Sequence, residues 1–224
     1  MLEVILDTET TGLSVRENHR IIEIGCIELD NQIPTNNIFH EIINPERKVS
    51  EAAYKVHGYS NEFLSNKKIF SEIADNFLDF IKNKKLIIHN APFDLSFLNH
   101  ELKILQKKLI NKDDVIDTLE IARQKYPGSQ NSLDALCKRF NVNNSKRIKH
   151  SALIDCELLK EVYINLVDQK EPKLNLENIN NMNFNLENPK FKNNIKRKIV
   201  ELSSEEYETH AKYLKKSLSK NNFS

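Results

Sequence analysis

The chain has 224 residues, of which 39% are hydrophobic and 29% are charged, proportions that are ordinary for a globular protein. No segment approaches the roughly twenty apolar residues that a membrane-spanning helix needs. The N-terminal MLEVILDTE carries acids where a signal peptide carries bases, so we expect a cytoplasmic protein. Cys26, Cys137 and Cys156 lack metal-ligand spacing and fit buried thiols in a reducing compartment.

The formal net charge of +1 is unevenly distributed along the chain. From Lys190 onward there are nine Lys and Arg residues against four acids, which leaves 24 basic and 28 acidic residues, a net −4, before that point. A domain that bound nucleic acid through phosphate neutralisation alone would carry the opposite charge. If this part of the chain handles nucleic acid, bound cations must offset its acids.

Apolar periodicity predicts strands first and an alternation of strands and helices afterwards. The predicted strands lie at residues 2–6, 20–29, 38–43, 86–89 and 115–117. The predicted helices lie at residues 70–81, 93–107, 118–123, 132–140 and 151–167. This order is typical of an α/β fold in which helices cover the faces of a mixed sheet.

The periodic pattern ends after Asp168, which makes residues 1–168 the predicted folded domain. Residues 169–198 contain many asparagines and two prolines, a composition that predicts a flexible linker. Residues 199–224 contain a helix start, with Ser203 or Ser204 as N-cap, two glutamates in the first turn and lysines at the far end. Such a segment cannot form a core of its own, so we expect it to dock on a partner.

Two carboxylates end the first apolar run, in the stretch ILDTETTGL. Asp7 and Glu9 are two residues apart, and residues with this spacing in a strand project from the same face. Burying two neighbouring carboxylates costs free energy unless a positive charge lies between them. Taken alone, the pair is weak evidence for a site and fits a solvated, acidic strand end better.

Two later stretches add matching chemistry. In IIHNAPFDLSFL, Asp94 is predicted on the first turn of the helix that follows a buried strand. In KHSALIDCELL, His150 precedes Asp155 by five residues, so the two cannot share a helical face. If Ser151 caps the helix, His150 lies in the loop before it and Asp155 in its second turn. Four acids with one loop histidine fit two divalent cations held by oxygen ligands.

The motifs DTETTGL, HNAPFD and H-x4-D, in this order, resemble the three motifs of the DEDDh 3′–5′ exonucleases over about residues 1–168. The resemblance implies an RNase H-like mixed β-sheet flanked by helices. It also implies two divalent metal ions, Mg²⁺ or Mn²⁺, and a general base at His150. Ser151 stands where another subclass carries tyrosine, so the chain resembles the histidine subclass. The implied metal ligands are Asp7, Glu9, Asp94 and Asp155.

The stretches VHGYSNEFL and HSALIDCELLKEVY resemble the proofreading, or epsilon, subunits of bacterial DNA polymerase III. The order of nuclease domain, linker and C-terminal segment is similar as well. This resemblance implies a DNA 3′ end as substrate and binding of residues 199–224 to the polymerase (alpha) subunit. The peptide EPKLNL, from Glu171 to Leu176, resembles a peptide that binds the sliding clamp, although such peptides usually begin with glutamine.

The same resemblance implies a set of substrate contacts. They are Asp7, Glu9, Ala52, His57 and Asp155. Ala52 replaces a glutamate of these subunits, which leaves only backbone or apolar contact at that position. Residues expected beside the terminal nucleotide are Thr8, Thr10 and Leu13. Phe93 and Phe97 either stack on a base or, as their helical spacing favours, belong to the core.

Two other functions remain open from the sequence. A free-standing exoribonuclease of the oligoribonuclease or RNase T type would share every active-site residue, because the chemistry is common to DNA and RNA. A catalytically inactive adaptor between clamp and polymerase is expected to lack at least one acid, and this chain has all four. The linker and tail favour the proofreading subunit, since a free-standing nuclease has no use for them.

Overall fold

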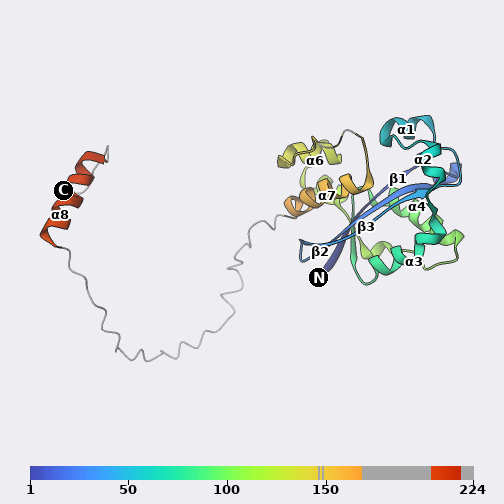
Figure 1. The fold of residues 1–224 in the computed structure, drawn as a ribbon, viewed down its shortest axis with the longest axis horizontal. Coiled ribbons are helices and arrows are strands. Elements are labelled where there is room, and N and C mark those ends of the chain that lie inside the picture. Colours follow the sequence, from blue (N-terminus) through green and yellow to red (C-terminus); the bar gives the residue numbers. More distant parts are fainter. Residues whose placement is uncertain (146, 148, 168–202, 218–224) are drawn as a thin grey trace, which may run out of the picture. The chain divides into compact units, whose positions relative to one another are not determined.

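Six strands form one mixed sheet in the order β4–β3–β2–β1–β5–β6 (Figure 1). The computed structural model describes residues 1–145, 147, 149–167 and 203–217. The strands are β1 Leu2–Thr10, β2 Ile21–Asp30, β3 Ile33–Asn44, β4 Lys68–Ile69, β5 Lys85–Ile88 and β6 Val115–Asp117. β1 is antiparallel to β2 and parallel to β5, so the meander meets the parallel part of the sheet at β1.

Helices cover both faces of this sheet, as Figure 1 shows for α3 and α4 on one side and α6 and α7 on the other. Val4 and Leu6 of β1 pack into the cluster that α3 and α4 complete, whereas Ile5 faces the cluster of α5, α6 and α7. Because both faces are buried, β1 reads as a continuous apolar run. The helices of this unit are α1 Glu51–His57, α2 Asn61–Ser65, α3 Phe70–Ile81, α4 Ala91–Ile104, α5 Thr118–Lys125, α6 Leu133–Phe140 and α7 Ala152–Leu166, with 3₁₀ turns at Val15–Glu17 and Lys112–Asp114.

A glycine allows α7 to lie directly against the sheet. Gly25 of β2 pairs with Asp7 of β1, and a Cβ atom at this position would lie 2.6 Å from the backbone carbonyl carbon of Ala152. Any side chain there would push the start of α7 away from β1. The residue at position 25 therefore sets how close the residues of α7 come to the carboxylates of β1.

The predicted α/β fold, a mixed sheet with flanking helices, is confirmed. The first strand is longer than predicted: β1 continues to Thr10, so Asp7 and Glu9 lie inside the strand and not at its end. Pairing with β2 along this whole length holds these polar residues in the ladder, and no local pattern reveals it. Likewise β3 begins at Ile33, five residues before the predicted start.

Two short helices were not predicted. α1 and α2 lie between β3 and β4, and the side chains of Ser50 and Ser60 cap their N-termini. Gly58 ends α1 in the left-handed conformation (φ 80°), where glycine is favoured. The Ser and Gly signals are present in the sequence, but each helix has too few residues to show a 3.6-residue period.

The chain divides into two units, and the described part of the second is α8, Ser204–Ser217. Ser203 and Glu206 exchange hydrogen bonds in a capping box at its start. The side chains of Tyr207 and Tyr213 are exposed. The predicted linker at residues 169–198 and the peptide from Glu171 to Leu176 lie outside the described residues.

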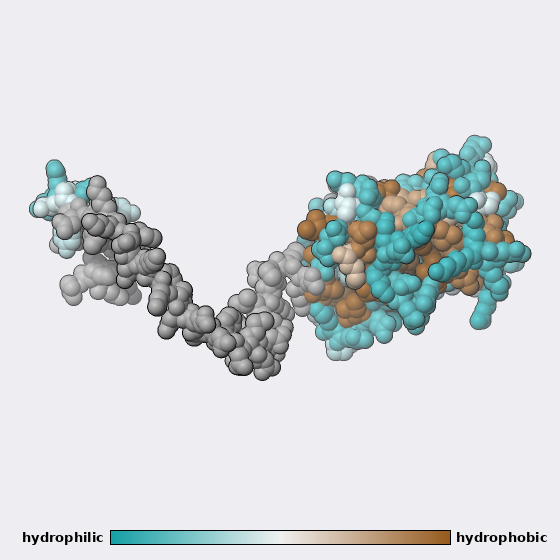
Figure 2. All heavy atoms as spheres, turned by 90° about the horizontal axis from the view of Figure 1, so that it is seen from below, coloured by the Kyte–Doolittle hydropathy of each residue, from teal (hydrophilic) through white to brown (hydrophobic). Residues whose placement is uncertain are grey.

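Hydrophilic residues cover much of the face of the first unit drawn in Figure 2, and apolar residues form separate patches between them. Of the helices in the described ranges, none is long and apolar enough to cross a membrane.

Candidate active site

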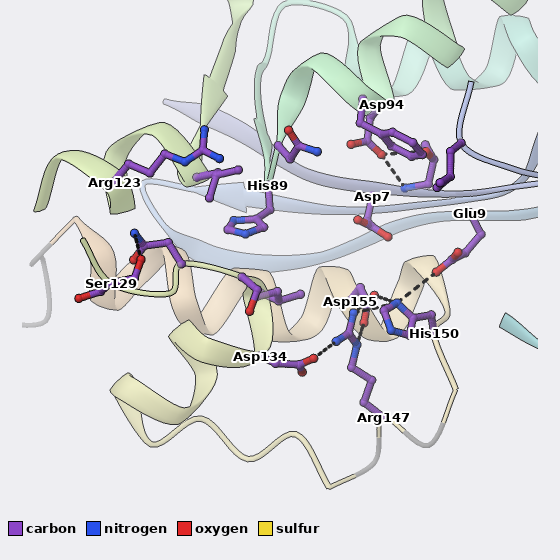
Figure 3. Close-up of a pocket in the computed structure, with 18 of the residues that line it drawn as sticks. Asp7, Glu9, His89, Asp94, Arg123, Ser129, Asp134, Arg147, His150 and Asp155 are labelled. Carbon is purple, nitrogen blue, oxygen red and sulfur yellow. Dashed lines mark hydrogen bonds and ion pairs between the residues drawn. The ribbon is translucent and has the colours of Figure 1, made fainter. Parts of the chain in front are cut away.

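A cavity of about 890 Å³ lies where β1, α4 and α7 meet (Figure 3). Its lining includes the four predicted acids and His150, which come from segments far apart in the chain. β1 provides Asp7 and Glu9, the first turn of α4 provides Asp94, and the first turn of α7 provides Asp155. His150 lies in the loop before α7. Asp155 was predicted in the second turn of this helix and lies in the first.

The two carboxylates of β1 project into the cavity from alternate positions of the same strand, as their spacing predicts. Thr8 projects from the opposite face of β1 and holds Asp94. Its backbone N–H and its hydroxyl both donate to Asp94 Oδ1, at 3.1 and 2.7 Å. Asp94 is buried, with 3% of its surface exposed. The acids of β1 and α4 are thereby fixed relative to one another before any ligand binds.

The close packing of these acids raises their pKa values. Burial raises the pKa of Glu9 to about 8, and the charge of Asp155 adds to this effect. Burial also raises the pKa of Asp94 to about 7 and that of Asp7 well above its usual range, with further contributions to Asp7 from Asp94, Asp155 and Glu9. The cluster therefore binds positive charge, as protons or as cations, at neutral pH.

His150 lies at the open side of the cluster, with its side chain 43% exposed. Its Nδ1 atom is 3.4 Å from Asp155 Oδ2 and 4.0 Å from Glu9 Oε1. Partial burial and the charge of Arg147 lower the pKa of the imidazole. The backbone N–H of His150 donates to the carbonyl oxygen of Val56, at 3.2 Å, which joins this loop to the end of α1.

Arg147 is a site residue that the sequence reasoning missed. Its Nε and Nη2 donate to the two carboxylate oxygens of Asp155, each at 2.6 Å. Nη1 lies 2.8 Å from Asp134 Oδ2, and Nη2 lies 2.9 Å from His150 Nδ1. Figure 3 shows the guanidinium between the acids and the imidazole. The only signal in the sequence is a basic residue three positions before His150, which no periodic pattern distinguishes from a surface arginine.

The donor set fits divalent cations. Ligand atoms of Glu9, His150 and Asp155 lie within 4.8 Å of one another. Mg²⁺ and Mn²⁺ prefer carboxylate oxygens, and burial of Glu9 and Asp94, which raises their pKa values, makes a bound positive charge favourable beside them. The positive charge of Arg147 offsets only part of the negative charge of the four acids. The residues that would hold cations are Asp7, Glu9, Asp94 and Asp155.

Two of the expected substrate contacts lie outside the residues that line the cavity. Ala52 is exposed on α1. His57, at the end of α1, is buried and accepts a hydrogen bond from the backbone N–H of Tyr59 at its Nδ1, at 3.0 Å. Its Nε2 is buried without a hydrogen-bond partner among the described residues. A ligand atom reaching this nitrogen would satisfy it.

The other pocket residues divide between the cavity and the core. Thr8 and Leu13 line the cavity, and Leu13 is 85% exposed, as an apolar wedge would be. Thr10 is buried and donates to the carbonyl oxygen of Gly12. Phe93 lines the cavity, whereas Phe97 belongs to the core, as its helical spacing favours. The far side of the cavity has residues that were not predicted, among them Arg123, Asn131 and Asp134.

A mixed sheet with helices on both faces and a cluster of four acids and a histidine beside β1 are the features of an exonuclease of the RNase H-like type. Residues 4–163 match the Exonuclease family of the RNase T type, and the chain belongs to this family. The family implies divalent metal ions at the acidic cluster.

The chain is similar to proteins called DNA polymerase III subunit epsilon in two Rickettsia species. The protein of Rickettsia conorii is 48% identical over 223 residues, which cover 96% of each chain. That of Rickettsia felis is 54% identical over 172 residues, which cover 75% of each chain. Among solved structures, the nuclease domain of 3′hExo, a DEDDh family member bound to rAMP, superposes with a TM-score of 0.65 at 18% identity, over 75% of this chain and 92% of that one. This last likeness supports the fold alone.

Proposed function

We propose that this chain is the proofreading 3′–5′ exonuclease subunit of a bacterial replicative DNA polymerase, acting in the cytoplasm on DNA 3′ ends. The observation that carries the proposal is the convergence of Asp7, Glu9, Asp94, Asp155 and His150 on one cavity. A catalytically inactive adaptor has no need of this complete set. The similarity to epsilon subunits along 96% of the chain, including the C-terminal segment, favours proofreading over free-standing RNA trimming.

The four acids hold the metal ions in this proposal. Asp7, Glu9 and Asp155 would hold one cation, and Asp7 with Asp94 would hold the second. Such a pair of cations, when bound, stabilises the attacking and leaving oxygens and makes the attacking water more acidic. Thr8 keeps Asp94 in place through its two hydrogen bonds, so the ligand geometry is prepared in advance.

His150 is the general base. A guanidinium can only donate, so the contact from Arg147 Nη2 makes Nδ1 the accepting nitrogen of a neutral ring. Nδ1 also faces the carboxylates, and Arg147 must release this atom before it receives the proton that leaves the attacking water. The lowered pKa keeps the ring neutral, and therefore able to accept, at physiological pH. The phosphodiester bond breaks by in-line attack, and a 5′-nucleotide leaves.

The substrate contacts extend from the cluster toward α1. The Nε2 atom of His57, which has no hydrogen-bond partner in the described part of the chain, supports a polar contact to the terminal nucleotide. Leu13 and Phe93 offer apolar surface at the mouth of the cavity. Ala52 adds at most an apolar or backbone contact.

We assign a separate role to each of three segments of the chain. Residues 1–168 form the nuclease domain, residues 169–198 form a linker, and residues 199–224 bind the alpha subunit of DNA polymerase III. The peptide from Glu171 to Leu176 binds the sliding clamp. The exposed tyrosines of α8 support a docking role for the last segment, because α8 has no core of its own to bury them.

A direct comparison of DNA and RNA tests this function. The purified chain is incubated with single-stranded DNA and RNA oligonucleotides of the same sequence, in Mg²⁺ or Mn²⁺ and in chelator. We expect metal-dependent release of 5′-nucleotides from DNA 3′ ends. Preference for RNA by more than about tenfold in kcat/KM would favour the free-standing exoribonuclease.

A further inference from the structure

Glu23, on β2, is completely buried and accepts four hydrogen bonds. It is the register partner of Glu9 on β1, yet it does not line the active-site cavity. The bonds to its Oε1 come from His40 Nε2 at 2.7 Å and Ser151 Oγ at 2.9 Å. Those to its Oε2 come from the backbone N–H of Ala152 at 3.0 Å and Tyr59 Oη at 3.1 Å. These bonds hold the pKa of Glu23 below its usual range in spite of burial, so it is a carboxylate at neutral pH.

Two of these bonds fix the start of α7. Ser151 occupies the N-cap position, but its side chain makes no capping hydrogen bond to the helix, because its hydroxyl donates to Glu23. Instead, the Glu23 carboxylate accepts the free N–H of Ala152 and places a negative charge at the N-terminus of a 15-residue helix. Glu23, a residue of β2, thus replaces the usual N-cap side chain of α7. The base His150 directly precedes this anchored pair.

A third bond leads to the expected substrate histidine. Tyr59 donates its hydroxyl proton to Glu23, its ring stacks on the imidazole of His57 at 5.3 Å between centroids, and its backbone N–H donates to His57 Nδ1. His57 therefore keeps its orientation through Tyr59. The loop of His150 also meets this region, because its N–H donates to Val56, the residue before His57.

We propose that Glu23 is a positioning residue for the reaction, which holds the base His150 through the start of α7 and the substrate contact His57 through Tyr59. This inference rests on the function proposed above. His150 is 43% exposed and lies in a loop, so its place depends on how the adjoining backbone is anchored. A displacement of about 1 Å at such a group costs up to about 100-fold in rate.

β2 also offers a matched control. Glu28 is buried like Glu23 and accepts hydrogen bonds from Thr35 Oγ1 and Asn37 Nδ2, each at 2.7 Å, besides an ion pair with Lys84. It pairs with Val4, well before the acids of β1, and its partners Thr35, Asn37 and Lys84 are not among the residues that line the cavity. A merely structural buried carboxylate would behave as Glu28 does.

The test compares Glu23→Gln with Glu28→Gln in steady-state digestion of single-stranded DNA, together with Tm and Mn²⁺ binding by calorimetry. An amide presents one acceptor oxygen where four donors converge. It therefore cannot hold the start of α7 and the Tyr59 hydroxyl in the same geometry as the carboxylate does. We expect Glu23→Gln to lower kcat by about 10- to 100-fold and to raise KM. Glu28→Gln should lower Tm by a similar amount, change neither kinetic constant by more than about threefold and leave Mn²⁺ binding unaltered.

Variants that each remove one hydrogen bond to Glu23 separate its effect on α7 from its effect on Tyr59. They also keep the test sound if Glu23→Gln fails to fold. Ser151→Ala should lower kcat with little change in KM, and Ser151→Thr, which retains the hydroxyl, should recover most of the loss. Tyr59→Phe should raise KM more than it changes kcat. The proposal is overturned if Glu23→Gln, Ser151→Ala and Tyr59→Phe all have kcat and KM within threefold of those of Glu28→Gln. An inactive wild-type enzyme, by contrast, would reject the proposed function itself.

Discussion

Arg147 donates hydrogen bonds to both carboxylate oxygens of Asp155, each at 2.6 Å, and thereby occupies the acid that the family motif assigns to a metal. The guanidinium is nearly buried, and Asp134 at 2.8 Å gives it a second partner outside the four-acid cluster. A cation that binds Asp155 must compete with this pair. Arg147 can retain Asp134 when it leaves Asp155.

Replacement of Arg147 should therefore tighten metal binding. Hydrogen bonds to charged groups contribute about 1.5–3 kcal/mol each, so Arg147→Gln should lower the Kd for Mn²⁺ by at least about tenfold. The Tm of the chelated protein should fall, because four acids then lack their nearest positive charge. Isothermal titration with Mn²⁺ and thermal unfolding in chelator measure the two effects.

Arg123→Gln is the control for that measurement. Arg123 lines the same cavity and carries the same charge, whereas the guanidinium that pairs with Asp155 among the described residues is that of Arg147. It should change the Kd for Mn²⁺ by less than about threefold. Weaker metal binding in Arg147→Gln would mean that Arg147 prepares Asp155 for the metal and does not compete with it.

The raised pKa of Glu9 predicts a dependence of stability on pH in the metal-free protein. Glu9 titrates at about 8 in the folded chain against 4.5 for an ordinary glutamate, so the folded state binds this proton more tightly than the unfolded one. The resulting stabilisation is complete below pH 4.5 and is lost as the pH rises through 8. In chelator, Tm should fall by several degrees between pH 5.5 and pH 8.5.

Glu9→Gln should flatten this profile, because the amide does not titrate, and excess Mg²⁺ at pH 8.5 should restore Tm in the wild type. Thermal unfolding by circular dichroism at a series of pH values provides the measurement. If the two chelated proteins lost Tm equally over this range, the cluster would not be short of positive charge.

The four acids and His150 could be identified from the sequence, because each belongs to a short motif beside an element with clear apolar periodicity. The residues that organise them could not. Arg147 contacts Asp155 from a loop with no pattern, and Glu23 meets Ser151 across 128 positions of the chain. A glutamate inside an apolar strand looks like an edge or a solvent-facing position until its partners are known. The length of β1 likewise depends on pairing with β2 and not on local propensity.

The role of His150 predicts a loss of rate without a loss of metal. His150→Ala should lower kcat by about 10²- to 10⁴-fold, the usual contribution of a general base, while Mn²⁺ binding by the carboxylates persists. His100→Ala, which removes a histidine outside the cavity, should retain the wild-type rate. Single-turnover digestion gives the rate, and a His150→Ala rate within threefold of wild type would assign the imidazole a structural role only.

The proposed division of the chain predicts that catalysis and docking separate. The described residues of 1–167 contain all the residues of the cavity and both apolar clusters, so a chain that ends at Asp168 should fold and digest single-stranded 3′ ends. Short isolated helices are marginal in water, so α8 should gain stability only on a partner. The truncated protein should lose binding to the polymerase subunit in a pull-down. Equal binding by both lengths would move the docking surface to the nuclease domain.

The most direct test of the proofreading function is a primer–template assay with the polymerase subunit present. Primers with a mispaired or a paired 3′ nucleotide are extended in Mg²⁺ with the wild-type chain or with Asp7→Ala. We expect the wild type to remove the mispaired nucleotide at least about tenfold faster than the paired one and to permit extension. Asp7→Ala, or wild type in chelator before extension, should leave the mispair in place. Equal removal of both 3′ nucleotides, or undiminished removal by Asp7→Ala, would contradict the proofreading function.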